Sequence, residues 1–79
     1  MRKDVLAVIK QYKHEIVEFH DNEPYINDWW HYLDDVAINA HDYEETGKIH
    51  INLYNWFDDV GVVDMIKTDT LTIEELTNL

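Results

Sequence analysis

The sequence predicts a single all-α domain over residues 1–79, folded as a small bundle of three to four helices. Apolar residues recur at intervals of 4, 3, 4 and 3 in three separate segments, which is the spacing of one face of a helix. Hydrophobic residues make up 46% of the chain, enough for a core, and there is no cysteine to form a disulfide. The alternative is an α+β domain with a short strand or hairpin around residues 48–54.

The first helix is expected over residues 4–20, with Asp4 as its cap. Its apolar stripe consists of Val5, Ile9, Tyr12, Ile16 and Phe19. Residues 21–24 end the helix, because Asp21 and Asn22 favour a turn and a proline follows at position 24.

A second helix is expected to begin after Asn27 or Asp28 and to end at Gly47. Its apolar stripe consists of Trp29, Leu33, Val36, Ala40 and Tyr43. The opposite face is acidic and carries His31, Asp34, Asp35, Asp42 and Glu45. Ile38 is the exception, because the helical spacing places it within the acidic face.

Residues 48–66 fit two patterns. Ile49, Ile51 and Leu53 alternate as in a strand, whereas Ile49, Leu53, Trp56, Val60 and Val63 have helical spacing. A helix is favoured because an isolated strand has no evident pairing partner. A short last helix over residues 73–79 is indicated by the capping-box pair Thr72 and Glu75.

The formal net charge of −11 is unevenly distributed along the chain. Residues 1–13 have a net charge of +3, residues 14–66 of −12, and residues 67–79 of −2. Such a field repels nucleic acids and anionic membranes and attracts basic protein surfaces. The sequence has neither a signal peptide nor an apolar run of about 20 residues that could span a membrane, so a cytoplasmic protein is expected.

The sequence predicts no enzyme, cofactor or metal site, although its five histidines leave a metal site as an alternative, since His31 lies at i,i+3 or i,i+4 spacing from Asp28, Asp34 and Asp35. The chain has no serine, no cysteine and only two glycines, which excludes serine and cysteine nucleophiles and a glycine-rich phosphate loop. The adjacent acidic pairs, such as Asp34 and Asp35, would point about 100° apart on a helix and would not converge on one site. The run from His14 to Glu18 begins like the HExxH zinc motif but lacks the second histidine.

The sequence therefore predicts a binding protein whose partner is basic, and the favoured partner surface is the DNA- or RNA-binding channel of a nuclease. The predicted partner-binding residues combine carboxylates with one aromatic anchor: Asp28, Trp30, Asp34, Asp35, Asp42, Glu44, Glu45, Asp58 and Asp59.

In size, charge and lack of enzymatic motifs the chain resembles the small acidic inhibitors of phages and mobile elements, namely anti-CRISPR, antirestriction and related DNA-mimic proteins. This resemblance implies an inhibitor that acts by partial DNA mimicry, but it assigns no residue roles. The alternatives are an immunity protein or antitoxin that neutralises one basic toxin, and a non-enzymatic module that assembles as a homodimer or larger homo-oligomer.

Overall fold

The computed structural model describes residues 1–43 and 47–79 and consists mainly of antiparallel β-strands. The order of elements is α1 (Lys3–Ile16), β1 (Val17–His20), β2 (Glu23–Ile26), β3 (Trp29–Tyr32), β4 (Val36–Tyr43), β5 (Lys48–Phe57), β6 (Gly61–Leu71) and α2 (Ile73–Thr77). Strands account for 54% of the structure and helices for 25%. The predicted all-α bundle, and with it the description of the protein as helical, is therefore wrong.

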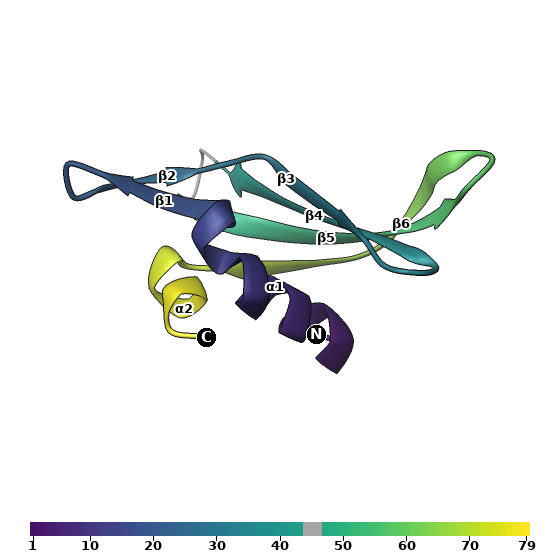
Figure 1. The fold of residues 1–79 in the computed structure, drawn as a ribbon, viewed down its shortest axis with the longest axis horizontal. Helices are drawn as coiled ribbons and strands as arrows, with labels where there is room; N and C mark the ends of the chain where they lie inside the picture. The colour runs from purple at the N-terminus through teal and green to yellow at the C-terminus, as the bar shows by residue number, and fades with distance from the viewer. Residues whose placement is uncertain (44–46) are drawn as a thin grey trace.

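Four strands form one sheet in the order β3-β4-β5-β6, and β1 and β2 form a separate hairpin. Each strand of the four-stranded sheet pairs with its neighbour in the chain, so the topology is a simple meander (Figure 1). The register places Ile38 of β4 opposite Leu53 of β5 and Asn39 opposite Asn52. Since side chains alternate between the two faces of a sheet, these two pairs lie on opposite faces.

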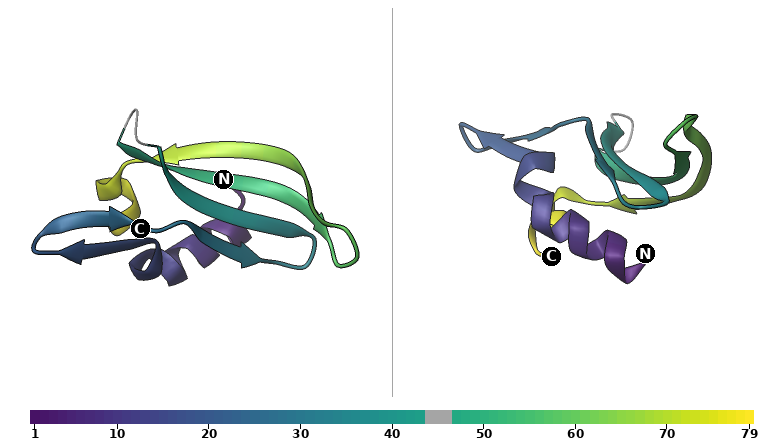
Figure 2. Two further views of the ribbon diagram at one scale, coloured as in Figure 1. Left: turned by 90° about the horizontal axis from the view of Figure 1, so that it is seen from above. Right: turned by 45° about the vertical axis from the view of Figure 1, so that its right-hand side comes forward.

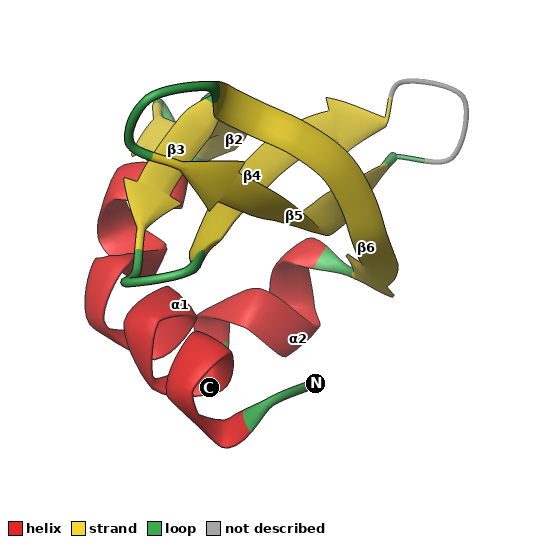
Figure 3. Cartoon of the chain, turned by 90° about the vertical axis from the view of Figure 1, so that its right-hand side faces the viewer, coloured by secondary structure: helices red, strands yellow, loops and turns green. Residues whose placement is uncertain are grey.

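Both helices cover the same face of the sheet, as Figure 3 shows, and the core lies between them and the strands. We call this side the covered face. It supplies Val36, Ile38, Ala40, Ile49, Ile51 and Leu53 to the core. From the helix side, Val5, Ile9 and Ile16 of α1 and Leu76 of α2 pack against them.

Helix α1 matches the predicted apolar stripe over most of its length, since Val5, Ile9 and Ile16 are buried. It ends at Ile16 rather than at residue 20, because Val17 has an extended backbone and pairs with Ile26 of β2. The position before the helix is Arg2, so Asp4 is not the cap but lies in the first turn, where its carboxylate accepts a hydrogen bond from the Val5 amide.

The turn predicted at Asp21 and Asn22 is confirmed. Both residues have positive φ angles, 52° and 67°, and they connect β1 to β2. Asparagine and aspartate tolerate this left-handed conformation better than most residues, and two such residues make the turn that fits the twist of a β-hairpin.

The second and third predicted helices are strands. Val36, Ile38 and Ala40 lie on the covered face of β4, so Ile38, which disagreed with the helical pattern, is fully buried. In the same way Ile49, Ile51 and Leu53 lie on the covered face of β5. The objection that a strand near residue 50 would have no partner fails, because β4 and β6 pair with β5 on its two sides.

The register between β5 and β6 shifts at two places, between Leu53 and Tyr54 and between Tyr54 and Trp56. At both places β6 contains an extra residue. Extra residues of this kind bend a strand and increase its twist. The β5–β6 hairpin accordingly bends away from the helices (Figure 1). Irregular pairing also makes an edge strand a poorer template for aggregation.

The last helix, α2, begins with the predicted capping box. The Glu75 amide donates to the Thr72 hydroxyl at 3.0 Å, and the Thr72 amide donates to the Glu75 carboxylate at 3.1 Å. Within residues 1–43 and 47–79, neither helix is long and apolar enough to cross a membrane.

Candidate protein-binding surface

The sheet face opposite the helices, which we call the open face, is not covered by any part of the chain that the structure describes (Figure 2, left). Alternation along the strands brings a set of aromatic and polar side chains to it. These are Trp30 and Tyr32 of β3, Ala37, Asn39, His41 and Tyr43 of β4, Lys48, His50, Asn52, Tyr54 and Trp56 of β5, and Val62, Met65, Thr68 and Thr70 of β6.

Four of these side chains, Trp30, Tyr32, Tyr54 and Trp56, form a cluster that we call the aromatic platform. The ring centroids of Trp30 and Tyr32 are 6.3 Å apart, those of Trp30 and Tyr54 5.5 Å, and those of Tyr32 and Trp56 4.9 Å. Trp30 and Tyr32 remain 40% and 51% exposed. Ring pairs at such distances stabilise each other, so the platform is a preformed apolar surface that water still reaches.

Two features hold the aromatic platform in place, a small buried residue between its rings and a hydrogen bond to the backbone. Ala37, opposite both Tyr32 and Tyr54 in the register, is fully buried even though it lies on the open face. The indole N–H of Trp56 donates a 2.8 Å hydrogen bond to the carbonyl of Leu33. Both features limit the orientations that the rings can take.

A row of polar side chains crosses the sheet beside the platform. The Thr68 hydroxyl donates to the Asn52 amide oxygen at 2.9 Å, and the Asn52 amide nitrogen donates to the Asn39 amide oxygen at 3.1 Å. The Asn39 amide nitrogen in turn donates to the Asp28 carboxylate at 2.9 Å and to the Trp29 carbonyl at 3.1 Å. We call Asp28, Asn39, Asn52 and Thr68 the polar row; because its two asparagines are only 4% exposed, these bonds stabilise the sheet itself.

Beyond the polar row the open face carries two histidines. His41 and His50 are directly opposite each other, with ring centroids 5.4 Å apart, and the ring of Tyr43 lies 4.4 Å from that of His50. No group of three histidine, aspartate or glutamate side chains within residues 1–43 and 47–79 is arranged to hold a metal ion.

The structure brings some of the predicted partner-binding residues together and separates others. Asp34 and Asp35 lie in the β3–β4 turn and Asp58 and Asp59 in the β5–β6 turn, at the same end of the sheet. The Trp56 amide, at 3.5 Å from the Asp35 carbonyl, links the β3–β4 turn to β5. We call these four residues the acidic end; they are exposed and follow directly on the aromatic platform, to which the predicted anchor Trp30 belongs.

The remaining predicted residues lie elsewhere. Asp28 is part of the polar row. Asp42 is exposed near the opposite end of β4, on the covered face, since it is paired with Ile49. Glu44 and Glu45 lie outside the described residues. The prediction of one acidic helical face that carries Asp34, Asp35 and Asp42 is therefore wrong. Asp34 and Asp35 lie in the turn before β4, whereas Asp42 lies near the other end of that strand.

Sequence reasoning missed most of the platform and the whole amide part of the polar row. The signal was present in the aromatic pairs Trp30–Tyr32 and Tyr54–Trp56, each spaced by two residues as on one face of a strand. The helical interpretation of both segments separated the members of each pair by about 200° around a helix, so it could not identify them as neighbours.

Net charge distinguishes the helices from the rest of the molecule. Residues 2–16 and 73–77, which comprise the helices and Arg2, contain four bases and four acids. The other residues contain two bases, Lys48 and Lys67, and thirteen acids, so they carry the entire net charge of −11. Lys67 lies on the covered face opposite Leu53, which leaves Lys48 as the one cation of the described open face.

Arg2, Asp4 and Glu75, which lie on the helix side, have shifted pKa values. The Arg2 guanidinium donates two hydrogen bonds to the Asp4 carboxylate, which raises the pKa of Arg2 and lowers the pKa of Asp4; Asp35 adds a weaker attraction that also raises the pKa of Arg2. Hydrogen bonds from the Thr72 amide and hydroxyl lower the pKa of Glu75. Both sets of bonds hold helix termini, so these shifts are consequences of capping and of surface pairing.

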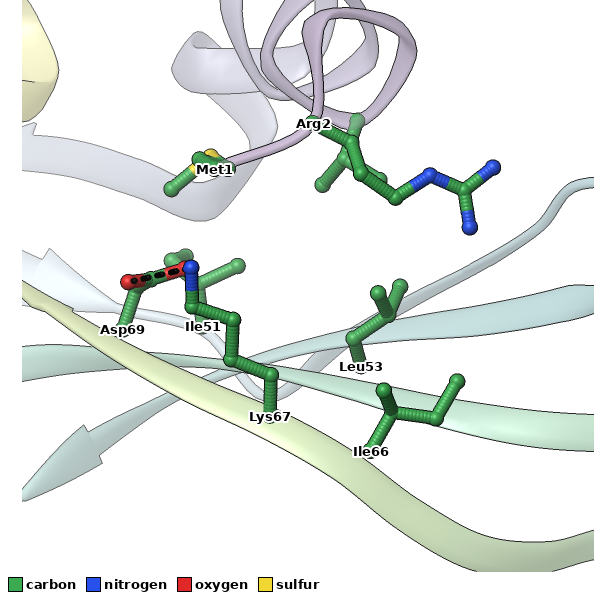
Figure 4. A pocket seen from close by; sticks show the side chains of 8 residues that line it. Met1, Arg2, Ile51, Leu53, Ile66, Lys67 and Asp69 are labelled. Atoms are coloured by element: carbon green, nitrogen blue, oxygen red, sulfur yellow. Dashed lines mark ion pairs between the residues drawn. The ribbon is translucent and has the colours of Figure 1, made fainter.

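A pocket of about 220 Å³ lies on the covered face, between the start of α1 and the strands β5 and β6 (Figure 4). Its lining is mostly apolar and includes Met1, Val5, Ile51, Leu53 and Ile66, together with Arg2, Lys67 and Asp69. The Arg2 side chain is bonded to Asp4, and the Lys67 ammonium is 3.7 Å from the Asp69 carboxylate. The pocket is smaller than the roughly 300 to 1,000 Å³ of typical ligand sites, and its charges are already paired, so the open face is the stronger candidate.

No known protein family matches the chain, and neither a curated protein nor a solved structure shows detectable similarity to it.

Proposed function

We propose that the protein is a small acidic inhibitor that binds the basic nucleic-acid-binding surface of another protein as a partial DNA mimic. The observation that carries the proposal is the acidic end, where four exposed carboxylates adjoin an exposed aromatic platform. Carboxylates attract and orient a basic partner, and a neighbouring aromatic group provides the apolar contact that interface anchors supply.

Charge density limits how closely the protein can imitate DNA. Its longest dimension is 42 Å, and duplex DNA of that length carries about 25 phosphates at one charge per ~1.7 Å. Outside residues 2–16 and 73–77, the chain contains thirteen acids. Electrostatics therefore supplies attraction, and the shape of the open face and its aromatic groups must supply specificity.

The favoured partner is a defence nuclease, such as a CRISPR effector or a restriction enzyme, because these proteins expose long basic channels to nucleic acid. Small size, an acidic surface and a lack of enzymatic motifs are the features of the phage-encoded inhibitors that act on such enzymes. The same carboxylates would serve an immunity protein, which would inhibit a single cognate toxin.

The test is competition with labelled duplex DNA for a CRISPR effector, a restriction endonuclease and a nuclease toxin, measured at several salt concentrations. We expect inhibition of at least one of them, with affinity that falls steeply as salt rises. Inhibition of the toxin alone would favour the immunity function, and affinity independent of salt would exclude the electrostatic mechanism.

A charge-matched pair of variants locates the site. Asp34→Asn, Asp35→Asn, Asp58→Asn and Asp59→Asn combined should abolish competition. Glu15→Gln, Glu18→Gln, Glu23→Gln and Glu74→Gln combined remove the same charge from exposed positions on the helices and the β1–β2 hairpin and should preserve it. Equal losses in both variants would show that net charge alone matters and would overturn the proposed site.

Hydrophobic residues of the β5–β6 hairpin favour a second candidate, self-association. Phe57, Val60 and Met65 are 56%, 68% and 58% exposed. Sedimentation at several protein concentrations tests this candidate; a homo-oligomer that dissociates in the Phe57→Ser variant, together with no effect on any nuclease, would favour an assembly module.

A further inference from the structure

The side chains of the open face indicate which kind of basic side chain it would bind. Trp30 and Tyr32 stand two residues apart on the edge strand β3, with ring planes inclined by only 14° and about half of each side chain exposed. Two nearly parallel rings at an exposed edge offer stacking surfaces to a flat group. Groups that pack on aromatic rings include planar nucleobases, the C–H faces of sugar rings and the planar guanidinium of arginine.

Nucleobases are disfavoured by the charge around the platform. The acidic end adjoins the rings, and the only cation of the described open face, Lys48, lies at the far end of β5. The residues outside 2–16 and 73–77 carry the whole net charge. Each base brings a phosphate, and stacking proteins for single strands combine aromatic rings with a basic groove. This surface has the opposite sign.

Sugars are disfavoured by the polar row. A sugar on an aromatic surface is oriented by hydrogen bonds from neighbouring side chains. The Asn39 and Asn52 amide groups are buried and bonded to Asp28, to the Trp29 carbonyl, to each other and to Thr68. Their donors are therefore used within the sheet, where they hold the strands in register and keep the platform rigid.

Arginine fits both features of the surface. Its guanidinium is planar, is weakly hydrated, stacks on aromatic rings and binds carboxylates through two parallel hydrogen bonds, whereas the lysine ammonium is a compact, strongly hydrated charge. Asp34 follows Tyr32 by two residues and Asp58 follows Trp56 by two residues, so the Cα atoms of each pair are at most about 7 Å apart. An arginine that stacks on the platform and a second basic residue beside it on the partner can thus reach carboxylates of both turns.

We propose that the aromatic platform and the acidic end together form an arginine-binding surface that discriminates against lysine. The inference rests on the proposed function in one respect only, that the partner is basic. The platform selects the guanidinium by stacking, and the carboxylates supply the charge.

The experiment uses two amidated hexapeptides of alternating glycine with either arginine or lysine, which have equal charge. Each is titrated into the ¹⁵N-labelled protein, and dissociation constants are obtained from the shifts of backbone amides and of the indole N–H groups of Trp30 and Trp56. We expect the arginine peptide to bind at least fivefold more tightly than the lysine peptide and to shift the Trp30 indole resonance.

Two aromatic variants provide the control. Trp30→Leu keeps an apolar side chain at the position and should bring the arginine peptide to the affinity of the lysine peptide. Tyr25→Leu removes a ring that is more exposed than Trp30, at 60%, from the β1–β2 hairpin and should leave the preference intact. The fold of each variant is checked from the dispersion of the same spectra.

The outcomes separate the inference from the proposed function. Equal binding of the two peptides, failure of both to bind, or a preference that survives Trp30→Leu would overturn arginine selection, whatever the result of the DNA competition. An arginine preference together with no inhibition of any nuclease would support the surface and reject the inhibitor.

Discussion

The two faces of one sheet show how differently the same strands can be used. On the covered face Ile38 and Leu53 are opposite each other and are sealed from water by helices. One residue away, on the open face, Asn39 and Asn52 are just as deeply buried although no described helix lies over them. Aromatic rings and a row of hydrogen bonds take the place of the missing second layer.

The helices and the rest of the chain also differ in net charge. The helices and Arg2 are electrically balanced, whereas the rest of the chain holds the net charge of −11. The helices stabilise the domain by covering the apolar core, whereas the carboxylates of the acidic end lie in turns outside that core. We expect substitutions on the covered face to act mainly on stability and those at the acidic end to act mainly on binding.

The largest effect is expected from Ile38→Ala on the covered face. The side chain is fully buried, so its truncation leaves a cavity and should lower the free energy of unfolding by about 2 to 5 kcal/mol. Urea denaturation followed by circular dichroism measures the change. Val63→Ala removes the same kind of group from a site that is 47% exposed and should cost less than ~0.5 kcal/mol; similar losses in both variants would contradict the assigned core.

The next effect is expected from Asn52→Asp in the polar row. The new carboxylate is buried, has lost the N–H donor and faces the Asn39 amide oxygen, so we expect a loss of about 2 to 4 kcal/mol at neutral pH.

The sign of the pH dependence follows from burial. The folded pKa of the introduced aspartate must lie above its unfolded value of about 3.9. The loss should therefore be small below pH 4 and should grow as the pH rises from the unfolded value to the raised folded value. The exposed substitution Asn78→Asp provides the control, and a pH-independent loss at position 52 would argue against a buried carboxylate.

A smaller effect is expected at the start of α2. Thr72→Ala removes the hydroxyl that accepts from the Glu75 amide, and the loss of such a cap typically costs about 1 kcal/mol. Hydrogen exchange of the α2 amides should report the fraying.

The Glu75 half of the capping box should respond to acid. Because its pKa is lowered in the folded state, the carboxylate contributes to stability above its unfolded pKa, and this contribution is lost as the pH falls through the folded value. Glu75→Gln should remove this part of the pH dependence, and an unchanged acid profile would contradict it.

The smallest effect on stability is expected from neutralising the acidic end. Asp34, Asp35, Asp58 and Asp59 are exposed and lie in turns, so each change to asparagine should alter the free energy of unfolding by less than ~0.5 kcal/mol. The combined variant should be as stable as the parent or slightly more so, because four like charges are removed. Clear destabilisation in thermal denaturation would mean that these carboxylates serve the fold.

Most of the strands could not be predicted from spacing, for a specific reason. Residues four apart share a face in a helix and also in a strand, so pairs such as Val36 and Ala40 or Ile49 and Leu53 fit both patterns. The decisive residues are three apart. Tyr43 lies on the open face and Ala40 on the covered face, which no helix stripe allows.

The amino-acid sequence by itself determined those features that depend on near neighbours in the chain. These are the apolar stripe of α1, the turn at Asp21 and Asn22, the capping box of α2 and the net charge. Their physics involves residues at most a few positions apart.

Tertiary structure alone decided the sheet and the candidate site. The platform joins Trp30 and Tyr32 to Tyr54 and Trp56, and the acidic end joins turns 24 residues apart in the chain. Which side chains meet across strands depends on register, and register is set by the burial of Ile38 and Leu53 under the helices, which no single segment of the chain specifies.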